Sequence, residues 1–268
     1  AYYSPFNVFP LDTDPLPENK DGWVLFLDEF NSANKPVQAA AYKLILDKKV
    51  GQYNLHPRCV IICAGNLITD RAIVVAQSTA MQSRLVHLEL EVTFEDWLQH
   101  VGIPFKYDNR ILAYLAQYPQ KLMDFKPEHT DKTFSSPRTW EFVNRLIANK
   151  HDISHMAPLL AGTISSDVAV EFIQFTKIFD QLPSIQQILA DPLAAPFPNT
   201  VDAKWATLTV LLDKIDDDTI GAIITYSERF GMDLRVYFIR SFIHRYPALK
   251  SHKAVAKTLV ALSRYINA

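Results

Sequence analysis

Two short apolar runs in the first quarter of the chain predict β-strands. Residues 23–27 follow a glycine and end at an Asp-Glu pair, and residues 59–64 end at Gly65 and Asn66. Apolar runs of this length, bounded by turn residues, are typical of strands buried on both faces of a parallel sheet. We therefore expect both strands inside an α/β sheet.

A helix is predicted between these strands. Asn34 is the expected N-cap, and Pro36 lies in the first helical turn. Apolar residues then recur at helical spacing, at Val37, Ala40, Ala41, Leu44 and Ile45. A turn or short hairpin is expected at 48–53. A strand, a helix and a second strand with apolar faces predict a right-handed parallel unit.

The next segments are less regular. Residues 71–84 predict a loose helix that ends at Arg84. Residues 86–92 alternate apolar and polar side chains, unlike the two earlier runs. Alternation indicates a strand with one face exposed or lightly covered, so we expect this strand at an edge of the sheet.

From residue 93 onward the pattern predicts helices only. Thr93 and Asp96 resemble a capping box at the start of a helix over 94–100, and Asp108 begins a second helix. Later helices are predicted at 136–147, 166–181, 184–190, 202–215, 217–230, 233–246 and 252–266.

Composition limits the class of protein. The chain has 268 residues, of which 49% are hydrophobic, which is enough to bury a sizeable core. A formal net charge of −2 argues against unspecific nucleic-acid binding, which needs a basic excess. The only cysteines, Cys59 and Cys63, lie within an apolar run, and no apolar run approaches the roughly 20 residues of a membrane span. These features predict a cytoplasmic protein without a disulfide framework or a direct role at a membrane.

The Asp28-Glu29 pair is the first candidate for chemistry. Carboxylates at the C-terminal end of a buried strand lie where open α/β sheets bind ligands. There an Asp can hold a hydrated Mg²⁺ ion, and an adjacent Glu can polarise a water molecule. The alternative is an ordinary strand that ends in a capping Asp.

Four features follow one another in a fixed order: Asp28-Glu29, Gly65-Asn66, Arg84 and Arg138. Arg138 follows Ser136 and Pro137, the expected N-cap and first residue of a helix. The segments are LFLDEFNSANKPVQAAAYKLILDKKVGQYNL, IICAGN, MQSRLVHLELEV and SSPRTWEFVNRLI. Together they resemble the AAA+ ATPases, and within them the MoxR-like branch, over about residues 22–150.

The resemblance implies a role for each residue. Asp28 would hold Mg²⁺, and Glu29 would orient or activate the attacking water. Asn66 matches the sensor-1 position, which hydrogen-bonds the water or the γ-phosphate. Arg84 matches the arginine finger that acts on the ATP of a neighbouring subunit. Arg138 matches sensor 2, which reaches the γ-phosphate from a helical lid.

The resemblance also implies a fold and an activity. The fold class would be α/β plus all-α: an incomplete parallel P-loop-type sheet at 1–92, a helical lid at 93–150 and a helical C-terminal domain at 151–268. The complete protein would hydrolyse ATP as a homo-oligomeric ring and use this cycle, like a chaperone, to remodel or load a partner protein. A docked cofactor protein is a further expected partner.

The sequence lacks one part of such a site. None of its seven glycines stands in a G-x-x-x-x-G-K-[ST] pattern, the loop that cradles phosphates. We expect either a C-terminal portion of a longer ATPase, inactive alone, or a naturally reduced relative that does not hydrolyse ATP. A sheet without its remaining strands predicts self-association. The alternative function is a non-enzymatic adaptor that keeps the fold for assembly.

Overall fold

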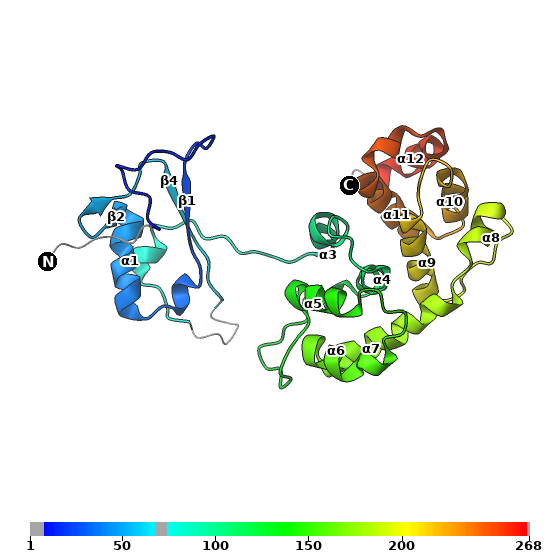
Figure 1. Cartoon of the computed structure of the whole chain (residues 1–268), viewed down its shortest axis with the longest axis horizontal. Helices are drawn as coiled ribbons and strands as arrows, with labels where there is room; N and C mark the ends of the chain where they lie inside the picture. The colour runs from blue at the N-terminus through cyan, green and yellow to red at the C-terminus, as the bar shows by residue number, and fades with distance from the viewer. Residues whose placement is uncertain (1–7, 68–73, 267–268) are drawn as a thin grey trace. The chain divides into compact units, whose positions relative to one another are not determined.

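The computed structural model describes residues 8–67 and 74–266. The chain divides into two compact units, drawn in Figure 1. Unit 1 comprises the chain up to Leu90 together with residues 126–128, and unit 2 comprises residues 91–125 and 129–268. Unit 1 contains a small parallel sheet and unit 2 is helical, so the coarse prediction of an α/β part followed by helices is confirmed.

Unit 1 is built on two parallel strands. Strand β1 (Trp23–Leu27) pairs with β4 (Cys59–Cys63), and the register joins Trp23 to Cys59 and Leu27 to Cys63. The remaining elements of this unit are η1 (Phe30–Ser32), α1 (Lys35–Asp47), the antiparallel pair β2 (Lys49–Val50) and β3 (Tyr53–Asn54), and α2 (Thr79–Gln82). Both predicted strands, the helix between them and the hairpin are thus present.

Helix α1 begins as predicted, because the side chain of Asn34 accepts a hydrogen bond from Val37 N at 3.1 Å. The predicted apolar face is wrong in part: Val37 and Ala40 are exposed, whereas Leu44 and Gln38 are buried. Gln38 tolerates burial because its Nε2 atom donates a hydrogen bond to Ala33 O at 3.0 Å. In the first turns of α1, the inward position is therefore taken by the hydrogen-bonded Gln38 side chain and not by an apolar residue.

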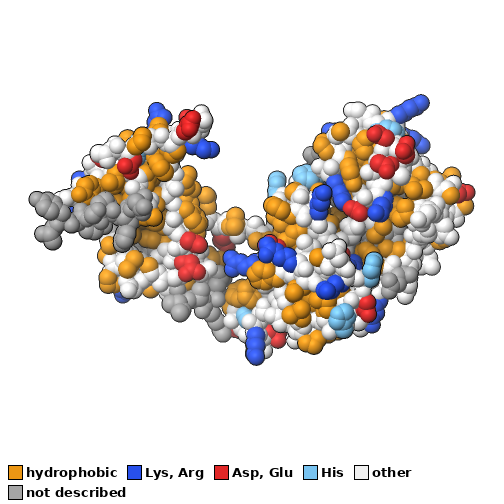
Figure 2. All heavy atoms as spheres, viewed as in Figure 1, with side chains coloured by type: hydrophobic (Ala, Val, Ile, Leu, Met, Phe, Trp, Pro, Cys, Tyr) orange, Lys and Arg blue, Asp and Glu red, His pale blue; other side chains and the backbone are white. Residues whose placement is uncertain are grey.

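The prediction that β1 and β4 are buried on both faces is wrong. One face packs in a small core with Leu44, Val50, Leu55 and Cys59. The other face carries four exposed side chains that form one patch, called here the sheet-face patch: Val24, Phe26, Val60 and Ile62. Figure 2 shows hydrophobic side chains reaching the surface of unit 1. In the described part of the chain no element covers this face.

The predicted edge strand at 86–92 is also wrong. These residues form no strand, and Val86, Leu88 and Leu90 are each about nine-tenths exposed (89%, 91% and 93%). A strand needs a hydrogen-bonding neighbour, and none is present among the described residues. Of the helix expected at 71–84, the structure describes α2 alone, and residues 71–73 lie outside the described ranges.

Unit 2 consists of helices and short helical turns. In chain order they are α3 (Phe94–Trp97), the π-helical turn η3 (Leu98–Gly102), α4 (Asn109–Gln117), η4 (Pro119–Lys121), α5 (Pro137–Ile147), η5 (Ser154–Met156), α6 (Ala157–Ile164), α7 (Ser166–Thr176), η6 (Lys177–Gln181), α8 (Ile185–Ala190), α9 (Val201–Asp213), α10 (Ile220–Ser227), α11 (Met232–Arg245), η7 (Pro247–Ser251) and α12 (Lys253–Ile266). Every predicted helix is present at these positions, with shifted ends, and α6 is an addition.

Two hydrophobic clusters hold unit 2 together. The first runs from Phe94 to Ala206 and has Tyr114, Trp140 and Phe172 at its centre. The second joins α8 to α12 around Tyr226 and Phe238. Residues on both sides of position 150 share the first cluster. The boundary expected there between a lid and a C-terminal domain therefore stays a prediction.

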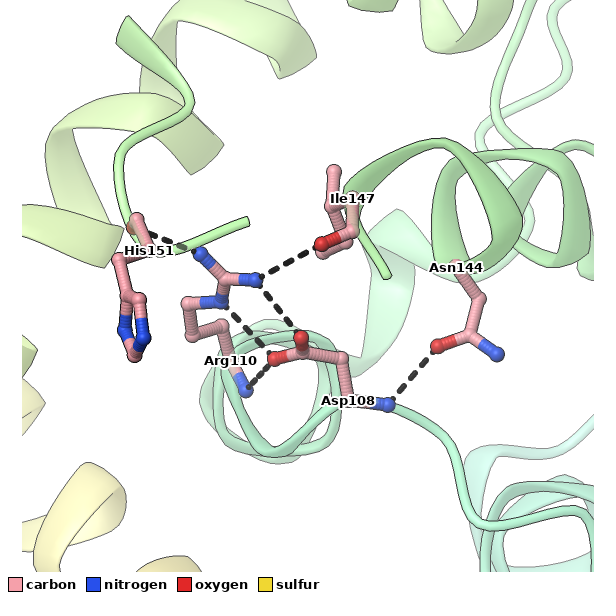
Figure 3. A network of polar contacts seen from close by, with 5 residues as sticks. All are labelled: Asp108, Arg110, Asn144, Ile147 and His151. Carbon is pink, nitrogen blue, oxygen red and sulfur yellow. Dashed lines mark hydrogen bonds and ion pairs between the residues drawn. The ribbon is translucent and has the colours of Figure 1, made fainter. Parts of the chain in front are cut away.

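A polar network ties α4 to the end of α5 (Figure 3). The guanidinium of Arg110 pairs with Asp108 (Nη2 to Oδ2, 2.7 Å) and donates to the carbonyls of Ile147 (3.3 Å) and His151 (3.0 Å). Asp108 N in turn donates to Asn144 Oδ1 at 2.8 Å. Because Arg110 donates to the carbonyl of Ile147, the last residue of α5, and to that of His151 in the segment after it, it fixes the end of this helix against α4.

None of the helices within the described ranges is both long enough and apolar enough to cross a membrane.

Candidate functional site

The carboxyl ends of β1 and β4 meet at one edge of the sheet. Ala64 N donates to Leu27 O at 2.9 Å, and Phe30 N donates to Ala64 O at 2.8 Å. These two bonds continue the parallel ladder beyond the strands. They bring the Asp28-Glu29 turn and the Gly65-Asn66 turn side by side, at the edge where the sequence predicts chemistry.

Both acids are accessible at this edge. Asp28 and Glu29 are exposed, and Asp28 Oδ1 accepts a hydrogen bond from Glu29 N at 3.0 Å. Glu29 has φ 50°, in the left-handed region that non-glycine residues seldom adopt. This conformation turns the chain immediately after β1, and both carboxylates are exposed to solvent at the turn.

Asn31 joins the two turns. Its Nδ2 atom donates to Asn66 O at 2.7 Å, and its Oδ1 atom accepts from Asn66 N at 3.2 Å. We call this pair of hydrogen bonds the Asn31–Asn66 clasp. A Cβ atom on Gly65 would lie 2.2 Å from Asn31 Oδ1, so only glycine allows the clasp at this position.

Asn31 is absent from the residues that the sequence singled out. The only local signal is that an amide side chain follows the Asp-Glu pair at the second position after Glu29. Its partner lies 35 residues away, and this distance in sequence hid the contact. Asn66 itself is exposed, and the clasp holds its backbone at the same edge of the sheet as the acids.

Arg84 lies outside this cluster of hydrogen bonds. It is exposed just beyond α2, and its Nη1 atom donates to Ala80 O at 2.7 Å in the same helix. Within the described residues the Arg84 side chain is hydrogen-bonded only to this preceding turn, so it can rotate toward a second molecule at little cost. The predicted action on a neighbouring subunit stays a prediction.

Arg138 lies in the first turn of α5, as predicted. Ser136 caps this helix: Ser136 N donates to Thr139 Oγ1 at 2.8 Å, and Thr139 N donates to Ser136 Oγ at 3.3 Å. Arg138 is exposed and belongs to unit 2, whereas Asp28, Glu29 and Asn66 belong to unit 1. The structure therefore does not bring Arg138 together with the acids within one unit.

The strand-end residues fit one part of a Mg²⁺–ATP site. A single carboxylate such as Asp28 suits Mg²⁺, which keeps several waters and is bound by one or two carboxylates plus substrate phosphates. Among the described residues no group of three or more His, Cys, Asp or Glu side chains could hold a metal by itself. Because the sequence contains no phosphate-cradling loop, the phosphates have no partner of that kind in this chain.

The two cysteines, which begin and end β4, are packing residues. Cys59 is fully buried, and burial raises the pKa of both the Cys59 and the Cys63 thiol. A thiol with a raised pKa stays protonated at neutral pH and is a poor nucleophile.

Comparisons with protein-family models, with curated proteins and with solved structures found no match to this chain.

Proposed function

We propose that this chain carries the metal-binding and water-activating part of an ATPase site of the AAA+ type, MoxR-like branch. The observation that carries the proposal is the pairing of β1 with β4, which places Asp28, Glu29 and Asn66 at one edge of the sheet. Two accessible carboxylates and one amide at the carboxyl ends of parallel strands match the needs of phosphoryl transfer, namely positioning and charge neutralisation.

Each residue has a defined part in the proposed reaction. Asp28 would hold Mg²⁺, which when bound would supply positive charge to the phosphates. Glu29 orients the attacking water and accepts its proton. The Asn66 amide hydrogen-bonds this water or the γ-phosphate.

Two arginines complete the proposal. Arg84 reaches the nucleotide of a neighbouring subunit, and Arg138 reaches the γ-phosphate of its own. Positive charge of this kind can contribute roughly 10³–10⁵ in rate. A residue that acts from a neighbouring subunit requires an assembly, so the active form is a homo-oligomer.

The proposed site also requires a phosphate-binding loop, which these 268 residues do not contain. Without backbone amides and a lysine to cradle the phosphates, the chain alone has little to hold a nucleotide by. The complete ring couples ATP hydrolysis to the remodelling or loading of a partner protein.

Manganese relaxation tests the metal site. In the natural polypeptide that carries this sequence, Mn²⁺ with ATP should broaden the amide signals of residues 28–31 and 65–66. The variant Asp28→Asn should lose this broadening, and the control Asp21→Asn, an exposed acid of the same unit, should keep it. Broadening that persists in Asp28→Asn, or that never reaches these residues, would contradict the proposed role of Asp28.

A non-enzymatic assembly protein is the second candidate. The sheet-face patch and the exposed Val86, Leu88 and Leu90 favour it, because monomeric proteins seldom expose contiguous apolar surface of this kind. A natural polypeptide that assembles but turns over no ATP would select this function.

A further inference from the structure

We propose that Asn31 is a positioning residue that holds Asn66 in register with the Asp28-Glu29 turn. The inference rests on the proposed function, because the role of Asn31 is to fix a residue that acts on the water or the γ-phosphate. The clasp itself is a structural feature that can be measured without any activity.

The geometry of the clasp leaves Asn66 little freedom. Asn31 engages both backbone polar atoms of this one residue, the carbonyl at 2.7 Å and the N–H at 3.2 Å. These two hydrogen bonds restrain the Asn66 backbone, while its side-chain torsions stay free. Displacement by about 1 Å can cost a hundredfold in rate, so this restraint bears directly on catalysis.

Asn31 is itself anchored. Its carbonyl accepts a hydrogen bond from Val75 N at 2.8 Å, and the preceding Phe30 is buried and bonded through its N–H to Ala64 O. Gln38, also buried, donates from Nε2 to Ala33 O at 3.0 Å and to Val75 O at 3.4 Å. The clasp is therefore held from both strand ends and from α1.

The residue types at both positions fit this role. The clasp needs one donor and one acceptor on a short side chain, and among the charged and polar residues asparagine supplies both at this length. Aspartate offers no donor at neutral pH, and its second oxygen would face the Asn66 carbonyl. Gly65 completes the fit, because any Cβ there would collide with Asn31 Oδ1.

Two substitutions break the clasp from opposite sides. Asn31→Ala removes the amide, and Gly65→Ala displaces it. The matched control is Asn54→Ala, which removes an exposed asparagine of the same unit whose Nδ2 donates to Asp12 Oδ2 at 3.0 Å. The three variants can be made in the chain described here and in the natural polypeptide.

Amide hydrogen exchange measures the clasp in the chain described here. Asn66 N–H should exchange about tenfold faster in Asn31→Ala and in Gly65→Ala, because it loses its acceptor. The amides of β1 and β4 should keep their protection in both variants, which shows that the sheet is intact. Exchange at Asn66 that matches the Asn54→Ala control would overturn the inference.

ATP turnover in the natural polypeptide measures the consequence. Asn31→Ala and Gly65→Ala should each lower kcat by about 10- to 100-fold with the KM for ATP unchanged, since Asn66 acts on the reacting groups. The double variant should fall no further than either single variant, because both remove the same restraint. Loss of a residue that merely stabilises the fold would instead lower the melting temperature and reduce turnover only in proportion to the unfolded fraction.

The outcomes separate the inference from the proposed function. Faster exchange with unchanged kcat overturns the positioning role while ATP hydrolysis stands. A wild-type natural polypeptide without ATPase activity overturns the proposed function and this role with it, although the clasp would still be visible by exchange.

Discussion

Phe26 of β1 and Ile62 of β4 are register partners in the parallel ladder, and both remain about half exposed, at 56% and 48%. Parallel strands are normally covered on both faces, so this pair marks a surface built for burial. Val24 and Val60, two residues earlier on each strand, extend the same patch.

This patch should drive self-association. Burying an apolar side chain of this size contributes about 1.5–3 kcal/mol, so Phe26→Ser combined with Ile62→Ser should weaken association at least tenfold. Sedimentation velocity over a concentration series measures the effect. The control is Val170→Ser, an exposed apolar residue on α7 of unit 2. Equal association of the double variant, the control and the wild type would remove the patch as an interface.

The Arg110 network should stabilise unit 2. Its arginine is 12% exposed and its Asp108 partner 22%, so Arg110→Ala removes a largely buried ion pair and one hydrogen bond to each of two carbonyls. We expect a loss of about 2–3 kcal/mol in the free energy of unfolding, measured by urea denaturation. Arg145→Ala, which breaks the exposed pair with Glu141, should cost about 0.5 kcal/mol or less. A similar loss in both variants would contradict the account of α5.

The free energy of unfolding should fall at high pH because of Tyr237. Burial raises the pKa of its phenol to about 12, although hydrogen bonds with Ser241 and Thr209 and the charge of Arg245 act in the opposite direction. The ordinary tyrosine pKa is about 10, so the unfolded chain loses this proton first. The contribution of Tyr237 is therefore fully present below about pH 10 and is lost as the pH rises toward 12.

Unfolding by urea at a series of pH values tests this prediction. The free energy of unfolding of the wild type should fall more steeply between about pH 10 and 12 than that of Tyr237→Phe, which has no proton to lose. Parallel curves for the two proteins in this interval would show that the phenol does not titrate differently on folding.

The sequence pattern correctly predicted those helices and strands that are determined by residues within a few positions of one another. The apolar run at 23–27, the Asn34 cap and the Ser136-Pro137 start each act within one turn or strand, and each is present in the structure. The strand expected at 86–92 failed because a strand depends on a partner that its own alternation cannot supply. Helix α6 was missed because Pro158 and Gly162 obscure a short apolar helix that its neighbours bury.

The sequence likewise predicted part of the candidate site, namely the residues at the ends of the two strands. The strand ends at Asp28 and Gly65 could be placed at one edge because parallel strands align their carboxyl ends. The role of Asn31 could not, because its partner is distant in sequence and the clearance at Gly65 is a property of the folded backbone. The positions of Arg84 and Arg138 relative to the acids depend on assembly and on the arrangement of units, which local pattern does not encode.

The most direct test of the central claim is ATP turnover by the natural polypeptide with Glu29→Gln. We expect hydrolysis to fall by at least about 10³-fold while ATP binding stays at the wild-type level, because glutamine keeps the shape of the side chain and loses the base. The matched control, Glu18→Gln, changes an exposed acid of the same unit and should leave both quantities unchanged. Turnover by Glu29→Gln at the wild-type rate would contradict the account.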